Sequence, residues 1–278
     1  MATDTYSGSL GHERIAGAAS GVSLSTTAAF VGLVKGTKLT TLITRNFSTA
    51  VVMRYAACPY LVVLKADSSD DLATVPTNYT EVAQDGSTST DVTLSGLAAG
   101  RYVYVGSAVP FRGVNIDVDS TNSTGSTALT VRYWSGLWTD LSDSDGTASS
   151  VSLDQDGSVT WTVPSALPWR AASLARISVE LGNGIADKFA WRDETMYWTR
   201  WEWSHAMDAS VTLNAMLAIN ESTAYAEIPT GITRQARVHM GFGQDGIAGY
   251  EMLTNAGTAN CLVNCASLDG YFSEGKVK

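Results

Sequence analysis

Residues 211–219, with the sequence VTLNAMLAI, contain the longest alternating series in the chain. Apolar residues recur at every second position from Val211 through Leu213 to Ile219, while Thr212 and Asn214 occupy positions between them. A period of two is typical of a strand that buries one face and exposes the other. This stretch therefore predicts a long antiparallel strand with its apolar face in the core.

Three shorter stretches on its N-terminal side repeat the same pattern. The alternation is clean in residues 114–118 (VNIDV), 129–133 (LTVRY) and 159–163 (VTWTV), and turns rich in Gly, Asp and Ser separate these stretches. Short strands joined by such turns are typical of an antiparallel β-sandwich or jelly roll. We place this domain at residues 102–225.

The composition extends this prediction to the whole chain. Of 278 residues, 31 are Thr, 30 are Ser and 25 are Gly, whereas only 16% are charged. Thr suits half-buried strands, and Ser and Gly suit the turns between them. Few segments carry apolar residues at helical spacing. The fold class is therefore predicted to be all-β, built from antiparallel sandwich or jelly-roll domains.

The flanking regions are predicted from their strand signals. Residues 1–35 are rich in Gly, Ser and Ala and are expected to form an extended N-terminal arm, and residues 36–101 a first β domain. The C-terminal segment, residues 226–278, has one plain strand and could return to pack on the first domain. Residues 170–193 interrupt the sandwich pattern. We expect a long connection there that covers an edge or makes contacts, with a short helix near 186–191.

Charge and cysteine content exclude several classes of partner. The net charge is −9 without a cluster of basic residues, which argues against nucleic-acid binding. The longest apolar run, near residues 60–64, is too short to cross a bilayer, and no secretory signal is visible. The three cysteines do not form a disulfide framework, and the Cys261 and Cys265 pair lacks a second ligand pair for zinc. We expect buried thiols and assembly in a reducing cytoplasm.

All eight tryptophans lie between residues 134 and 203. Adjacent residues of a strand point to opposite faces, so Tyr133 and Trp134 cannot both enter one core, and the same holds for Tyr197 and Trp198. Outward aromatic side chains predict burial against another domain or subunit. The candidate interface or ligand residues are Trp134, Trp138, Trp198, Trp201 and Trp203.

Four blocks of the central segment occur in a recognisable order. They are Pro110-Phe111, the Tyr-Trp-x-Gly-x-Trp stretch 133–138, the Gly-x-Val-x-Trp-x-x-Pro stretch 157–164, and Tyr-Trp-x-Arg at 197–200. Together they resemble a β-sandwich domain of virion structural proteins of tailed bacteriophages. The blocks cover less than half of the chain, and this sequence departs from the pattern by extra residues between Trp169 and Tyr197.

The resemblance implies a non-enzymatic structural component of a tailed-phage virion, assembled in the host cytoplasm. Capsid decoration, or a head- or tail-attached protein, would be its role. Its partners would be major capsid or tail proteins and further copies of itself. The alternative is a receptor- or carbohydrate-binding β-sandwich module, with a host glycan as partner. Neither interpretation requires a cofactor or a metal.

Other candidate sites have plainer interpretations. Residues 241–246 (GFGQDG) match Gly-x-Gly-x-x-Gly, but no helix pattern follows, so a glycine-rich turn is expected. The acidic cluster does not match a calcium loop and is expected to form solvated turns; its members are Asp140, Asp143, Asp145, Asp154 and Asp156. Asp193, Glu194 and Glu202 beside surface tryptophans could form a sugar platform or a paired-carboxylate site. His12, His205 and His239 are in no triad or metal motif, and we expect structural or surface roles.

Overall fold

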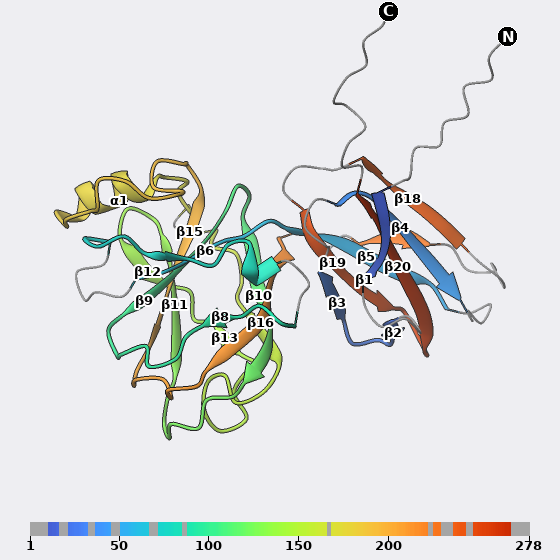
Figure 1. The fold of residues 1–278 in the computed structure, drawn as a ribbon, viewed down its shortest axis with the longest axis horizontal. Coiled ribbons are helices and arrows are strands. Elements are labelled where there is room, and N and C mark those ends of the chain that lie inside the picture. Colours follow the sequence, from blue (N-terminus) through green and yellow to red (C-terminus); the bar gives the residue numbers. More distant parts are fainter. Residues whose placement is uncertain are drawn as a thin grey trace, which may run out of the picture. The chain divides into compact units, whose positions relative to one another are not determined.

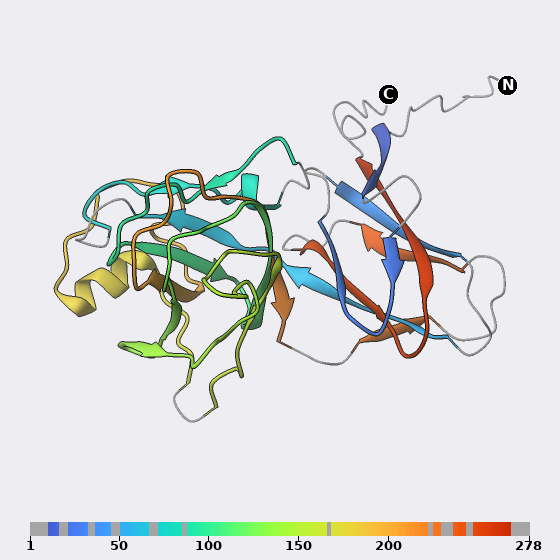
Figure 2. The ribbon, with the colours of Figure 1, turned by 90° about the horizontal axis from the view of Figure 1, so that it is seen from below.

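The computed structural model describes residues 11–16, 22–32, 37–45, 51–66, 72–84, 88–165, 168–221, 225–228, 236–242 and 247–267. These residues form four antiparallel sheets packed in pairs (Figures 1 and 2), so the predicted all-β sandwich fold is confirmed. The chain divides into two compact units. Unit 1 comprises residues 1–56, 225–245 and 250–278, and unit 2 comprises residues 57–224 and 246–249.

Unit 1 is built on two sheets. The first, sheet A, has the strand order β1 (Gly11–Ala16), β20 (Ala259–Ser267), β4 (Thr37–Arg45) and β18 (Ala236–Phe242), with β2 (Val22–Leu24) also paired to β20. The second, sheet B, has the order β17 (Ala226–Ile228), β5 (Met53–Pro59), β19 (Ile247–Thr254) and β3 (Ala29–Gly32). Both sheets supply fully buried apolar side chains, among them Leu24, Leu42, Met53 and Met252.

Unit 1 joins the two ends of the sequence. Residues 1–35 were expected to be an extended arm, but the described part of them contributes the three strands β1, β2 and β3. β1 and β2 each pair with β20 within the same unit, which satisfies the backbone groups on one side of each strand. The C-terminal strands β18 and β20 pair with β4, a strand of the expected first domain.

Unit 2 is a sandwich of two sheets. Sheet C has the order β12 (Trp138–Asp140), β11 (Leu129–Trp134), β15 (Tyr197–Trp203), β9 (Tyr102–Ser107), β6 (Val62–Lys65) and β7 (Thr77–Asn78). Sheet D has the order β13 (Ser144–Asp145), β14 (Gly157–Thr160), β10 (Phe111–Ser120), β16 (Thr212–Asn220) and β8 (Val92–Thr93). The predicted strands around 114–118, 129–133, 159–163 and 211–219 correspond to β10, β11, β14 and β16.

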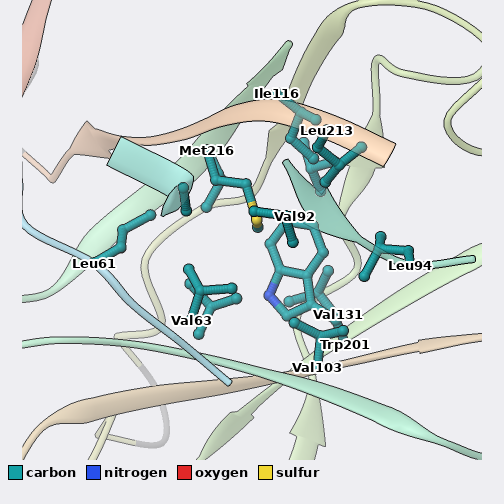
Figure 3. Close-up of a cluster of buried hydrophobic side chains, with 14 of the residues drawn as sticks. Leu61, Val63, Val92, Leu94, Val103, Ile116, Val131, Trp201, Leu213 and Met216 are labelled. Atoms are coloured by element: carbon teal, nitrogen blue, oxygen red, sulfur yellow. The ribbon is translucent and has the colours of Figure 1, made fainter. Parts of the chain in front are cut away.

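The core of unit 2 lies between these two sheets (Figure 3). Val63, Val103 and Trp201 from sheet C face Ile116, Leu213 and Met216 from sheet D, and all are at most 2% exposed. Alternation directs side chains of each strand into this layer, but the period of two does not run through the whole of β16. Leu213 and Met216 both lie in the core although they are three positions apart, because register shifts interrupt the pairing of β16 with β10. Leu217 and Ile219, which the sequence pattern placed on the core face, are buried but lie outside this cluster.

The expected domain boundary near residue 101 does not coincide with a boundary between the units. Residues 57–101 supply β6, which pairs with β9, and β8, which pairs with β16. They also supply the 3₁₀ helix η1 (Val82–Gln84). Because this segment donates strands to both sheets of the sandwich, it cannot form a separate core.

Candidate functional site on the tryptophan-rich sheet

Sheet C buries aromatic side chains on both of its faces. Along β15, Trp201 and Trp203 point to the core shared with sheet D, whereas Trp198 belongs to a second cluster on the outer face. Tyr133 and Trp134 of β11 divide in the same way, as predicted. The outer face of sheet C is therefore the unusual feature of unit 2, since a sandwich needs only one apolar face per sheet.

The tryptophans of the inner face are held by hydrogen bonds as well as by packing. The indole N–H of Trp201 donates to Thr199 Oγ1 over 2.9 Å, and that of Trp203 donates to Ser152 Oγ over 3.0 Å. Trp161 donates to the carbonyl of Phe111 over 2.9 Å. Buried indoles with their polar atom satisfied are structural elements of a core.

The connection between β14 and β15 covers the outer face. Its helix α1 (Leu174–Leu181) lies against sheet C (Figure 1), where Leu174 and Ile177 pack in one cluster with Trp134 and Trp198. The indole N–H of Trp198 donates to the carbonyl of Ala172 over 3.0 Å. The expectation that this connection makes contacts is confirmed, and the contacts are with its own sheet.

The helix in this connection lies earlier than predicted. Residues 186–191 are not helical, and the helix spans Leu174–Leu181 instead. Ser173 caps its first turn by accepting from the N–H of Arg176 over 3.2 Å, and Gly182 ends it in the left-handed region at φ 71°. These two caps fix both ends of an eight-residue helix.

Four of the five candidate tryptophans are buried inside unit 2. Trp134 and Trp198 are 0% exposed, Trp201 is 1% and Trp203 is 5% exposed. Trp134 and Trp198 were expected to be buried against another domain or subunit, and in the structure α1 and its flanking residues cover them. Trp138 is half-buried at the margin of the same cluster, with its ring centroid 5.3 Å from that of Trp134.

Gly106 makes room for Trp198. The two residues are direct cross-strand partners in β9 and β15. A Cβ atom placed on Gly106 would lie 2.5 Å from Cε3 of the Trp198 ring, well inside van der Waals contact. The indole thus lies directly over the glycine, and only a residue without a side chain fits beneath it.

We therefore expect Gly106→Ala to destabilise unit 2 by about 1–3 kcal/mol, the usual cost of overpacking a core. The matched control is Gly125→Ala, because a Cβ there meets nothing within 4 Å. Chemical denaturation of both variants measures the difference. Equal stability of the two variants would contradict the close approach of Trp198 to Gly106.

A polar cluster occupies the rest of the outer face. The Arg200 guanidinium lies over the Tyr102 ring, 4.1 Å from its centroid, and 5.2 Å from the centroid of Trp138. Arg132 Nη2 is 2.7 Å from Glu202 Oε1, and Arg200 Nη2 is 3.9 Å from Glu202 Oε2. Arg200 is only 8% exposed, so the aromatic rings and Glu202 hold a largely desolvated charge.

This cluster contains functional candidates that the sequence analysis missed. Arg132 and Arg200 are cross-strand partners, and their alternation with Val131 and Trp201 places both on the outer face. The period of two in these strands could have indicated that Arg132 and Arg200 share the outer face. Of the three acids proposed for a sugar platform, Glu202 lies in this cluster, whereas Asp193 pairs with Arg192 over 2.6 Å and Glu194 is exposed.

The acidic cluster organises turns. Asp154 accepts hydrogen bonds from the main-chain N–H groups of Ser149, Ser150 and Val151 at 2.7–3.2 Å, and from the hydroxyls of Ser149 and Ser150 at 2.9 Å. Because these donors favour the charged form, the pKa of Asp154 lies well below its usual range. Asp143, in contrast, has its pKa raised by burial. Among the described residues, no group of three His, Cys, Asp or Glu side chains is placed to hold a metal ion.

The lowered pKa of Asp154 predicts a pH-dependent contribution to stability. A carboxylate with a depressed folded-state pKa stabilises the fold above its unfolded pKa of about 3.9, and this contribution disappears as the pH falls through the folded value. Asp154→Asn should therefore lower the melting temperature at pH 7 and make less difference below about pH 4. The exposed Asp187→Asn is the control. If the difference in melting temperature between the wild type and Asp154→Asn stayed constant from pH 7 to pH 3, this role of Asp154 would be contradicted.

Where the structure describes them, the residues of the remaining motifs lie outside the polar cluster. His205 is exposed, and its Nδ1 lies 3.0 Å from the hydroxyl of Ser204. The side chains of His12, His239 and Cys265 lie outside the described residues, and so do residues 243–246 of the glycine motif. Cys58 and Cys261 are buried.

Comparison with known proteins identified no relative of this chain. No protein-family model, no curated protein and no solved structure matches the chain. Within the described part of the chain, no helix is long and apolar enough to cross a membrane.

Proposed function

We propose that this protein is a non-enzymatic structural component of a tailed-phage virion that acts by adhesion between subunits. Capsid decoration, or attachment to the head or tail, is its role, and its partners are major capsid or tail proteins and other copies of itself. The resemblance of the four central blocks supports this proposal. All four fall within unit 2, at the start of β10, in the β11–β12 hairpin, over β14 and its end, and in β15.

The observation that carries the adhesive role is the length of the two edge strands of sheet A in unit 1. Sheet A ends in β1, with six residues, and β18, with seven. In the described strand order, the other three sheets end in strands of two to four residues. Short edges prevent pairing with other chains, whereas a long edge offers a row of backbone donors and acceptors.

Trp134 and Trp198 on the outer face of sheet C are covered, so they do not supply the adhesive surface. The tryptophans that were expected to meet a neighbour are used to hold α1 and its flanking residues. Adhesion through sheet A needs main-chain pairing along β1 or β18 rather than an aromatic surface. A single contact of this kind is weak. When symmetry repeats it many times in one particle, the overall affinity becomes high.

Sedimentation velocity of the full chain tests this proposal, and we expect species larger than the 29.4 kDa monomer. Successive N–H groups of a strand point to opposite sides. Of the adjacent variants Val238→Pro and His239→Pro, one should therefore disturb the pairing of β18 with β4, and the other should weaken the oligomer while unit 1 stays folded. A chain that is monomeric at all concentrations and binds no particle would overturn the proposal.

A further inference from the structure

A pocket of about 330 Å³ lies on unit 2 beside Glu202. Its lining residues are Ala99, Gly100, Thr130, Glu202, Trp203 and Ser204. The volume is at the lower end of the range of small-molecule sites, about 300–1,000 Å³. Small residues on one side leave the space open, while the lining also contains one carboxylate residue and two hydroxyl residues.

Glu202 presents a fixed carboxylate to this pocket. Arg132 contacts its Oε1 at 2.7 Å, and Arg200 approaches its Oε2 at 3.9 Å. Arg200 itself lies over the Tyr102 ring, so the arginine that approaches Glu202 is fixed in place. The side chain of Glu202 remains 22% exposed, and Glu202 lines the pocket. A carboxylate has about four acceptor sites, and two arginine contacts do not exhaust them.

The charges around the pocket select against ionic ligands. Two guanidinium groups accompany the single carboxylate, so there is no surplus negative charge to attract a cation. The arginines do not line the pocket, and the one charged lining group is the acid, which repels an anion. The charges therefore favour neither a cation nor an anion, and a neutral ligand with several hydroxyl groups suits the pocket.

We propose that this pocket binds a neutral sugar. Hydroxyls of the sugar donate to the Glu202 carboxylate, and Thr130, the cross-strand partner of Glu202, adds a hydroxyl beside it. Trp203 also lines the pocket, while its indole points into the core, where its N–H donates to Ser152 Oγ. This binding goes beyond adhesion between subunits and uses residues of unit 2, whereas the adhesive edges belong to unit 1.

Saturation-transfer NMR on the full chain tests the site, with glucose, galactose, mannose and N-acetylglucosamine as probes. Glucuronic acid and glucosamine serve as charged comparisons. We expect saturation transfer to at least one neutral sugar and a weaker effect for both charged ones. Glu202→Gln should weaken that binding at least tenfold. Glu180→Gln is the matched control, because Glu180 is also an acid paired with an arginine, 2.7 Å from Arg176, and its side chain is 29% exposed.

Ala99→Trp keeps the test decisive if Glu202→Gln does not fold. Ala99 is exposed and contributes only its small size to the pocket, so a large side chain there fills the space without removing a contact. Its melting temperature should equal that of the wild type, and sugar binding should be lost. Absence of transfer to every neutral sugar, a preference for a charged sugar, or unchanged binding by Ala99→Trp would overturn the proposal.

Discussion

Ile177→Asp is expected to detach α1 from sheet C and to lower the free energy of unfolding by more than about 3 kcal/mol, because it places an unpaired charge in a buried apolar cluster. Ile177 is 2% exposed and packs with Trp134 and Trp198. The variant should also expose these tryptophans, which shifts their fluorescence to longer wavelength and increases binding of a hydrophobic dye.

The control for this prediction lies two residues further along the same helix. Val179 is 74% exposed, so Val179→Asp adds the same charge on the solvent side. Its stability should stay within about 0.5 kcal/mol of the wild type. Equal losses for the two variants would show that helix propensity, rather than coverage of the sheet, determines the effect.

Trp198→Ala is expected to cost about 3–5 kcal/mol, the usual penalty for removing a buried tryptophan. The ring is fully buried, and its N–H bond to the Ala172 carbonyl joins the connection to the sheet. Chemical denaturation measures the loss, and the exposed Leu137→Ala is the control. A loss below about 1 kcal/mol would contradict the central place of Trp198 in this cluster.

A double-mutant cycle isolates the contact between Trp198 and Gly106. Once the ring is gone, a methyl group on residue 106 has space, so Gly106→Ala should cost far less in the Trp198→Ala background. We expect a coupling energy of at least about 1 kcal/mol. Additive effects would mean that the penalty at Gly106 arises from the backbone rather than from the ring.

The one-faced strands of the sandwich could be predicted from the sequence because their signal is local. The alternation in residues 211–219 located β16, although register shifts against β10 change which side of the strand faces the core between Leu213 and Met216. Ser135-Gly136 closes the β11–β12 hairpin with Gly136 at φ 111°. The opposite placement of Tyr133 and Trp134 followed from the pleat alone. The order of the strands in each sheet could not be predicted, because a period of two does not identify the neighbour of a strand.

What covers the outer face of sheet C depends on contacts between distant residues. The pattern around Trp198 showed that a second apolar face exists, but nothing local indicated that Leu174 and Ile177 return to cover it. Ser173 and Gly182 are residue types that favour the two ends of a helix, and they could have indicated α1. The prediction of a helix at 186–191 did not take them into account. An eight-residue helix gives only two turns of periodicity, which is little to detect.

Gln84 shows a polar contact that no sequence pattern could predict. Its side-chain amide lies in the core, where Oε1 accepts from the N–H of Leu61 over 2.7 Å and Nε2 donates to the Leu61 carbonyl over 2.6 Å. The side chain thus pairs with the main chain as a strand would. The same limit applied to the polar cluster, because Arg132, Arg200 and Glu202 meet only through the pairing of β11 with β15.

Quantitative mass spectrometry of purified tailed-phage particles, from the phage that the proposed role requires as the source of this chain, tests that role most directly. We expect the intact chain in the particles at a fixed copy number that matches a symmetric element of the head or tail. Its absence from purified particles, while it accumulates in the lysate of the same infected cells, would contradict that role.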